Sequence, residues 1–167
     1  MIFRKAEHRD KEAIMDIIHQ AQISLKEANI DQWQNQYPNL ESIGNDIALG
    51  IGYVVEKEHE VVATVAYSFD GDDNYLHPVS GAWEINGGYA VIHRIAVQSQ
   101  YQGRGISDFM MEEFVKLAQE KQVASIRVDT HKENKKMQSY LARHGFNRIG
   151  VIRLKDGALR EAFEKKI

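Results

Sequence analysis

Two glycines separated by one residue mark the segment of the sequence best suited to binding an anion. The run Gln-Ser-Gln-Tyr-Gln-Gly-Arg-Gly-Ile-Ser-Asp occupies positions 98–108, and a helical pattern of apolar residues follows from Ile106. Glycine lets the backbone approach a ligand closely and adopt conformations that other residues avoid. The first N–H groups of a helix have no acceptor within the helix, and the helix dipole adds positive potential there. A phosphate or pyrophosphate is therefore the natural ligand of this segment.

Three interpretations of the pair, Gly103 and Gly105, compete on their spacing alone. A dinucleotide-binding fold would place a third glycine three residues after the second, where this chain has Asp108. A P-loop requires Gly-Lys-Ser/Thr, which does not occur in the sequence. A structural turn would need no ligand, and it is the favoured interpretation of an isolated Gly-x-Gly. The elements around the pair are therefore needed to choose among these three interpretations.

The apolar pattern around this segment predicts an α/β fold. A buried strand, Tyr89–Val97, leads into the turn, and another, Val123–Asp129, follows the helix. This strand–helix–strand unit and a second one over 123–154 imply partly parallel pairing through right-handed crossovers. A hairpin over 53–69 implies antiparallel pairing. We expect a single domain over residues 1–167, built as a mixed, partly parallel sheet flanked by helices.

The rest of the chain completes this order of elements. The segment 70–88 is acidic and interrupted by glycines, and it is expected to be either a functional loop or a solvated connection. Further strands are expected over 2–6, 53–56, 61–69, 146–154 and 160–167, and further helices over 10–28, 40–48 and 134–144.

Composition excludes several classes of function. The chain has 167 residues, no cysteine and a net charge of −3. Without cysteine it can form neither a disulfide framework, a thiolate metal site nor a cysteine nucleophile, and its histidines lack metal-ligand spacing. The acidic balance argues against nucleic acid as a partner. No run of 18 apolar residues occurs, so we expect no membrane span and a cytoplasmic location.

With these neighbours, the glycine pair resembles the signature of the GNAT superfamily of acetyl-CoA-dependent N-acetyltransferases. That signature is Gln/Arg-x-x-Gly-x-Gly/Ala between the fourth strand and the third helix, and Gln100-Tyr-Gln-Gly-Arg-Gly105 matches it. The strand Val91–Val97 is similar to the family's fourth strand. Asn134, followed eleven residues later by Gly145-Phe146, matches a second block of the family.

The resemblance implies how acetyl-CoA would be held. Backbone N–H groups around Gln102–Ser107 would bind the pyrophosphate, and the backbone of Ile95 and Val97 would pair with the pantetheine arm. Asn134 would lie near the thiol, a role compatible with capping a helix. The implied cofactor-binding residues are Ile95, Ala96, Val97, Gln102, Gly103, Arg104, Gly105, Ile106, Ser107 and Asn134.

The implied reaction is direct attack of a primary amine on the thioester, which calls for a base and an acid. His93, on the cofactor-facing strand, is the best candidate for the base, although a hydrogen-bonded core histidine is an equal alternative. In the family a tyrosine four residues before the Gly-Phe pair often protonates the thiolate, but here that residue is Leu141. Tyr140 lies about 100° round the helix and is a weaker candidate. We therefore keep a second possibility, a non-catalytic acyl-CoA-binding regulatory module.

The acceptor is expected among the N-terminal helices and the 70–88 segment. Trp33, Tyr37 and Trp83 could wall an apolar pocket, with core packing as the alternative. Glu84 could attract a cationic amine or act as a base. Because family members are often dimers, the resemblance also allows a homodimer. Tyr75 could also wall this pocket, and His131 could border the cleft. Like Glu84, the acidic residues Asp70, Asp72 and Asp73 could attract the amine, with plain solvation as the alternative.

Overall fold

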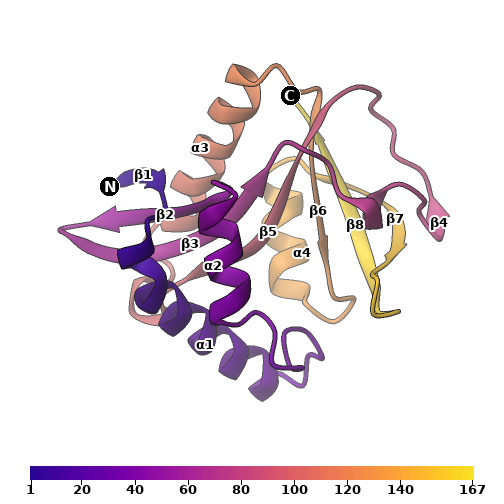
Figure 1. The fold of residues 1–167 in the computed structure, drawn as a ribbon. Helices are drawn as coiled ribbons and strands as arrows, with labels where there is room; N and C mark the ends of the chain where they lie inside the picture. Colours follow the sequence, from indigo (N-terminus) through magenta and orange to yellow (C-terminus); the bar gives the residue numbers. More distant parts are fainter. The chain divides into compact units, whose positions relative to one another are not determined.

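The structure is a computed structural model that describes residues 1–167. Figure 1 shows the course of the chain from the N-terminal strand to the C-terminal strand. The helices are α1 (Lys11–Glu27), α2 (Leu40–Ala48), α3 (Ile106–Glu120) and α4 (Lys135–Arg143), with short 3-10 helices η1 (His8–Asp10), η2 (Asp73–Tyr75) and η3 (Ser99–Tyr101). The strands are β1 (Ile2–Lys5), β2 (Gly52–Lys57), β3 (Glu60–Ser68), β4 (Ser80–Gly81), β5 (Tyr89–Val97), β6 (Ser125–Thr130), β7 (Asn147–Arg153) and β8 (Leu159–Lys166).

The strands form a mixed sheet in the order β1-β2-β3-β5-β6-β8-β7-β4. β5 and β6 run parallel, whereas β1 with β2, β2 with β3, β6 with β8 and β7 with β8 are antiparallel. The expected α/β class with a partly parallel sheet is therefore confirmed. The chain divides into two compact units: residues 1–67 with 93–113, and residues 68–92 with 114–167.

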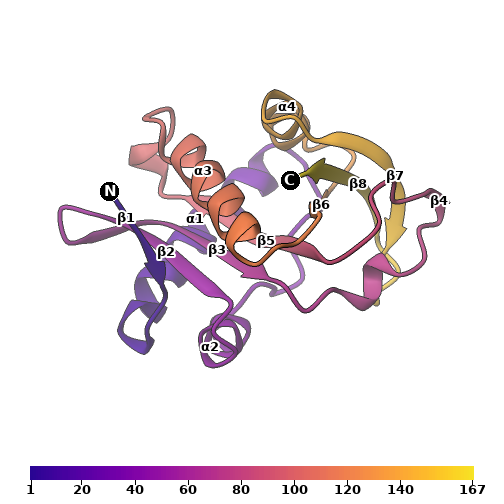
Figure 2. The ribbon, with the colours of Figure 1, turned by 90° about the horizontal axis from the view of Figure 1, so that it is seen from above.

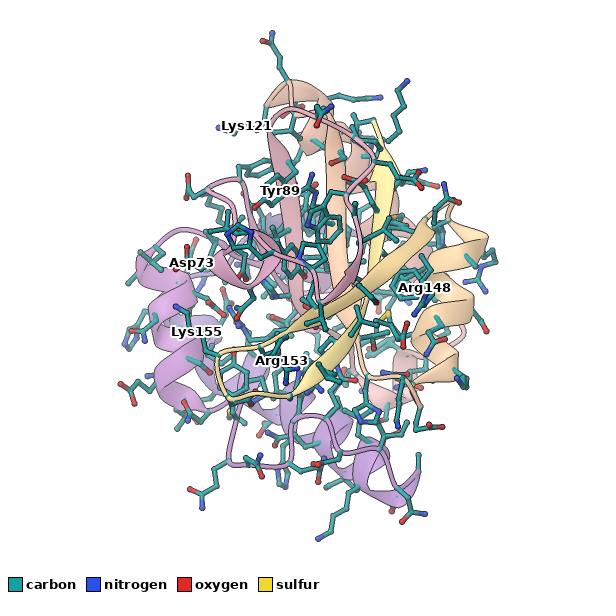
Figure 3. All side chains as sticks on the ribbon, turned by 90° about the vertical axis from the view of Figure 1, so that its right-hand side faces the viewer. Asp73, Tyr89, Lys121, Arg148, Arg153 and Lys155 are labelled. Carbon is teal, nitrogen blue, oxygen red and sulfur yellow. The ribbon has the colours of Figure 1, made fainter.

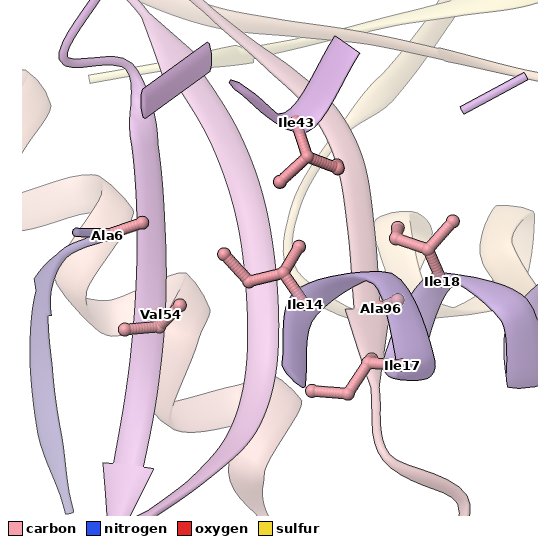
Figure 4. Close-up of a cluster of buried hydrophobic side chains, with 7 residues drawn as sticks. All are labelled: Ala6, Ile14, Ile17, Ile18, Ile43, Val54 and Ala96. Carbon is pink, nitrogen blue, oxygen red and sulfur yellow. The ribbon is translucent and has the colours of Figure 1, made fainter. Parts of the chain in front are cut away.

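The core of the first unit lies beneath α1 and α2. Ile14, Ile17 and Ile18 recur on one face of α1 and are each at most 2% exposed. They pack with Ala6, with Ile43 of α2, with Val54 of β2 and with Ala96 of β5 (Figure 4). Burial of one such isoleucine stabilises the fold by roughly 1.5–3 kcal/mol. Figure 2 shows the start of α3 on the opposite face of these strands from α2.

The second unit contains a strand order that differs from the expectation. We expected the unit over 123–154 to pair its two strands, but β8 lies between β6 and β7 and is antiparallel to both. The reason is the tight turn between β7 and β8, closed by the bond from Leu154 N–H to Ala158 O at 2.8 Å. The hairpin returns β8 along β7, and β8 takes the place beside β6.

The 70–88 segment contains short elements of its own. η2 and the two-residue strand β4 interrupt it, and β4 pairs with β7 through Ser80 and Gly81. Figure 3 shows Asp73 and Lys155, whose Oδ2 and Nζ atoms are 3.6 Å apart. The main chains of Gly81 and Gly150 are in such close contact that a Cβ on Gly81 would lie 1.8 Å from the Ile149 carbonyl oxygen. Part of this long segment is therefore fixed to the sheet.

None of the helices is both long enough and apolar enough to cross a membrane. No group of three or more histidine, aspartate or glutamate side chains is arranged so that it could hold a metal ion.

Candidate functional site

The glycine pair lies between η3 and α3 in the first unit. Gly103 has a φ of +74° and Gly105 a φ of +77°. A Cβ built on either residue would meet no atom within 4 Å, so space is not what requires glycine here. The left-handed backbone is the requirement, because it costs other residues roughly 1–2 kcal/mol each. The two glycines therefore shape the turn and leave its outer side open.

Two neighbouring segments, α1 and the start of β3, hold the turn that leads to the glycines. Gln20 of α1 accepts a hydrogen bond from the Ser99 N–H at 2.8 Å. Glu60, at the tip of the β2–β3 hairpin, accepts bonds from the Tyr101 hydroxyl at 2.7 Å and from Gln100 Nε2 at 3.3 Å. The Gln98 N–H donates to the Val62 carbonyl at 2.9 Å. The conformation of the turn is thus fixed before any ligand arrives.

The start of α3 and two cations supply positive potential beside the turn. An early backbone bond of α3 runs from the Phe109 N–H to the Gly105 carbonyl at 3.0 Å. Helix geometry directs the N–H groups ahead of Phe109 out of the helix end. Lys57 and Arg104 both lie over the Tyr101 ring, at 5.4 and 5.6 Å from its centroid. The hydrogen bond to Glu60 raises the pKa of the Tyr101 hydroxyl, so that hydroxyl remains a donor at neutral pH.

β5 loses its pairing with β6 and its regular backbone conformation shortly before it reaches this turn. Its parallel pairing with β6 runs from Tyr89 to Ile92 and ends there. Arg94 then has a φ of +52°, a conformation that few residues other than glycine adopt. His93, Ile95 and Val97 are half-buried, whereas Ala96 is 7% exposed and packs into the first core. The stretch from residue 93 to residue 97 is therefore irregular where the proposed pantetheine strand was expected.

Arg94 joins this strand to α2 and to the loop before it. Its Nε and NH2 atoms contact the two carboxylate oxygens of Asp46 at 2.7 and 2.6 Å, and its NH1 donates to the Tyr37 hydroxyl. Asp46 is 6% exposed. Burial alone would lower the pKa of Arg94, but the hydrogen bonds to Asp46 and Tyr37 raise it above its ordinary value. Neither Arg94 nor Asp46 was predicted from the sequence, where the one signal was an arginine within a largely apolar strand.

The expected acceptor residues of the first unit have structural partners. Trp33 is half-buried against the first core, as the packing alternative proposed. Tyr37 is 45% exposed, and its hydroxyl accepts the bond from Arg94. Tyr37 is thus connected to the strand that carries His93, while Trp33 supports the loop between α1 and α2.

The expected acceptor residues of the second unit belong to a buried polar cluster. Trp83 Nε1 donates to the Tyr75 carbonyl at 2.6 Å, and the Trp83 ring lies 4.3 Å from the Arg127 guanidinium. Arg127 also contacts Glu164, whose carboxylate accepts the Glu84 N–H at 2.9 Å. The Glu84 side chain itself is exposed. Trp83 is therefore held in place by this cluster, and Glu84 is anchored through its backbone.

Two further candidates near this cluster serve the fold. Tyr75 is 1% exposed and donates a hydrogen bond to Asp129 at 2.7 Å. Burial, followed by the charge of Asp129, raises the pKa of the Tyr75 hydroxyl well above its ordinary value. His131 Nδ1 accepts the Glu133 N–H at 3.1 Å, within the turn before α4.

The α4 helix, in the second unit, carries Asn134 and Tyr140. Asn134 caps the helix, because its Oδ1 accepts the Met137 N–H at 3.1 Å. Leu141 is 1% exposed and faces the core. Tyr140 packs edge-on against His144, with ring centroids 4.6 Å apart. The capping role of Asn134 is confirmed, and its role toward a thiol stays a prediction, as does that of Tyr140.

The first unit thus collects one continuous set of predicted residues: His93, Ile95–Val97 and the turn into α3. A turn with two left-handed glycines and a helix start, adjoining a strand that carries a histidine, is an arrangement that would suit the transfer of a group from a phosphate-bearing carrier.

Comparison with known proteins agrees with this geometry. The model of the acetyltransferase (GNAT) family matches residues 16–146. A GNAT-family acetyltransferase from Streptococcus agalactiae shares 29% identity and a TM-score of 0.87, over 99% of this chain and 95% of that one. A GNAT-family acetyltransferase from Listeria monocytogenes shares 23% identity and a TM-score of 0.73, over 99% and 94%.

A more distant structure is a ribosomal-protein-alanine N-acetyltransferase from Brucella melitensis. It shares 19% identity and a TM-score of 0.69, and the match covers 100% of both chains. No curated protein matches this chain.

Proposed function

Because this chain belongs to the acetyltransferase (GNAT) family, we propose that it transfers an acetyl group from acetyl-CoA to a primary amine by direct attack. The observation that carries the proposal is the preformed turn from Ser99 to Gly105, with its two left-handed glycines and the helix start behind them. Residues 1–167 act as one acetyltransferase domain in this proposal.

The residues of the turn fit the acidic part of acetyl-CoA. Backbone N–H groups from Gln102 to Ser107 would bind the pyrophosphate, and the exposed Arg104 side chain would add a cation. The backbone of Ile95, Ala96 and Val97 would pair with the pantetheine arm in the manner of an added strand. Ile106 is 2% exposed, so its side chain anchors the helix start while its N–H contributes to the site. Asn134 would approach the thiol end.

The amine must lose a proton before it attacks. An alkylammonium with a pKa near 10.4 is almost fully charged at pH 7, and freeing the amine costs roughly 4–5 kcal/mol. His93 would take this proton, directly or through a water molecule. The Ile95 N–H, two residues along the strand, would donate a hydrogen bond to the carbonyl oxygen as negative charge develops there.

The departing thiolate needs less help than the amine. A thiolate whose conjugate acid has a pKa near 8.5 leaves with little assistance. Tyr140 is the nearest tyrosine to the position where the family often has its acid, and we keep it as a proposed proton donor. Its packing against His144 supports the alternative of a structural aromatic residue.

The acceptor would be a small molecule or a peptide with a primary amine. Trp33 and Tyr37 in the first unit, and Trp83 and Glu84 in the second, are the proposed acceptor residues. The Glu84 carboxylate is exposed and could attract a cationic amine. The Brucella relative is a ribosomal-protein-alanine N-acetyltransferase, so peptide amines belong among the acceptors tested here.

One assay tests the proposal against its alternative. Thiol release from acetyl-CoA is measured with polyamines, amino acids, aminoglycosides and peptides with free N-termini, while calorimetry measures CoA binding. Release with at least one amine supports the enzyme. Tight CoA binding without release for any acceptor would instead establish an acyl-CoA-binding regulatory module, which the buried Leu141 at the usual tyrosine position favours.

A further inference from the structure

Arg94 occupies a position where the strand pattern calls for an apolar residue. Arg94 lies two residues before Ala96, which packs among the isoleucines beneath α1 and α2, and the Arg94 side chain is itself only 15% exposed. An arginine at this position must find partners, because an unpaired buried charge is strongly unfavourable. The bidentate contact with Asp46 and the bond to Tyr37 supply them.

The backbone of Arg94 is as unusual as its side chain. Its φ of +52° lies in the left-handed region. This conformation destabilises the fold when the residue has a Cβ. Such a conformation persists only where its surroundings hold it. Here the surroundings are specific: Asp46 lies near the end of α2, and its own carbonyl accepts the Ile51 N–H at 3.0 Å, which fixes it between α2 and β2.

We infer that Arg94 is a positioning residue, whose bridge to Asp46 and Tyr37 holds the left-handed backbone at residue 94 and thereby sets the orientation of His93 and Ile95. The inference rests on the proposed acetyl transfer, in which His93 takes the proton and the Ile95 N–H binds the carbonyl oxygen. Both are bonded to Arg94 through the main chain, so a change in its φ reorients both. Arg94 acts through the backbone, since each nitrogen of its guanidinium already donates to Asp46 or Tyr37.

Two substitutions at one position separate a backbone role from a direct one. Arg94→Ala removes the bridge and keeps a Cβ that disfavours positive φ, whereas Arg94→Gly removes the bridge and tolerates positive φ. We expect Arg94→Ala to lower kcat by on the order of tenfold or more, because small misplacements of reacting groups are costly. Arg94→Gly should be at least about fivefold more active than Arg94→Ala. The KM for acetyl-CoA should change less than kcat in either variant, because the proposed pyrophosphate contacts at residues 102–107 are kept.

Arg4 offers a matched control in the same unit. It makes a bidentate ion pair with Asp10, at 2.7 and 2.9 Å, and its φ is not positive. Arg4→Ala should lower the urea midpoint of unfolding and leave kcat unchanged, and Arg4→Gly should be no better than Arg4→Ala in either measurement. Asp46→Ala, which removes the bridge from its other end, should reproduce the loss of kcat.

Equal loss of kcat in Arg94→Ala and Arg94→Gly would overturn the inference, as would wild-type kcat in both. Urea midpoints are measured alongside: a left-handed residue 94 predicts that Arg94→Gly unfolds at a higher urea concentration than Arg94→Ala. A wild-type chain that binds CoA but releases no thiol would overturn the proposed function and the catalytic half of this inference. The urea midpoints of Arg94→Ala and Arg94→Gly would still test whether the bridge holds the left-handed backbone at residue 94.

Discussion

The Tyr101 hydroxyl donates a hydrogen bond of 2.7 Å to Glu60, and so attaches the turn before the glycine pair to the tip of the β2–β3 hairpin. The two residues are 41 positions apart in the sequence. The turn is therefore held from outside its own segment, and the anion site proposed there depends on the hairpin. This relationship leads to the first prediction.

Tyr101→Phe should weaken CoA binding without disturbing the fold. It removes one hydrogen bond, while the ring remains beside Lys57 and Arg104. A Kd for CoA about three- to eightfold higher is expected by calorimetry. Tyr53→Phe is the control, since Tyr53 stacks on Phe3 within the sheet. An unchanged Kd for Tyr101→Phe would show that the hairpin does not organise the turn.

Gly103 should tolerate neither a Cβ nor a charge, for different reasons. Gly103→Ala meets no neighbouring atom but must adopt a φ of +74°, so it should destabilise the turn by roughly 1–2 kcal/mol. Gly103→Glu adds a carboxylate beside the phosphates and should abolish CoA binding. Calorimetry with CoA measures both. Gly157→Glu is the control, because Gly157 has a φ of +89° and open space but lies in the β7–β8 turn. If Gly103→Glu bound CoA normally, the anion site would lie elsewhere.

His93→Ala should lower kcat by on the order of 10²–10⁴-fold if His93 is the base. The acidic limb of the kcat/KM profile against pH should move or disappear in the same variant, because that limb reports protonation of the base. His131→Ala, which alters a histidine in a turn, should keep the wild-type profile. A profile unchanged in His93→Ala would remove His93 as the base and leave Glu84 to be tested.

Asp10 should make stability depend on pH in the acid range. The hydrogen bond from Arg4 lowers the pKa of the Asp10 carboxyl below its ordinary value of 3.8. The unfolded chain therefore binds the proton more readily, and this stabilising contribution is present above about pH 4 and is lost as pH falls through the lowered pKa. Asp10→Asn should cost about 1–3 kcal/mol at pH 7 and flatten the dependence.

Urea unfolding at pH 7, 5, 4 and 3 checks this prediction for Asp10. Asp16→Asn, at an exposed position of α1, is the control and should follow the wild type. Parallel curves for Asp10→Asn and the wild type would contradict it.

The sequence predicted those features that depend on local pattern. The strand Tyr89–Val97 has the predicted bounds, because its apolar run ends sharply at the polar turn. The helix cap at Asn134 could also be predicted from the sequence, since capping depends on residues within one helical turn. The position of β8 between β6 and β7 was missed, because two strand–helix–strand units are equally consistent with adjacent parallel strands.

Long-range polar contacts explain most of what was missed at the site. Arg94 and Asp46 are 48 positions apart, and each alone resembles an ordinary surface charge. Nothing in their local sequence shows that they meet, so the positive φ at Arg94 could not be foreseen.

The contact of Gly81 with Gly150 leaves no space for a side chain at either position. A side chain at residue 81 would strike the Ile149 carbonyl oxygen, and one at residue 150 would come within 2.0 Å of the Ser80 carbonyl oxygen. The atoms in the way belong to the main chain, which every amino acid shares. A smaller side chain elsewhere cannot make room at these positions, so suppressors of a mutant of either glycine should act by releasing β4 from β7.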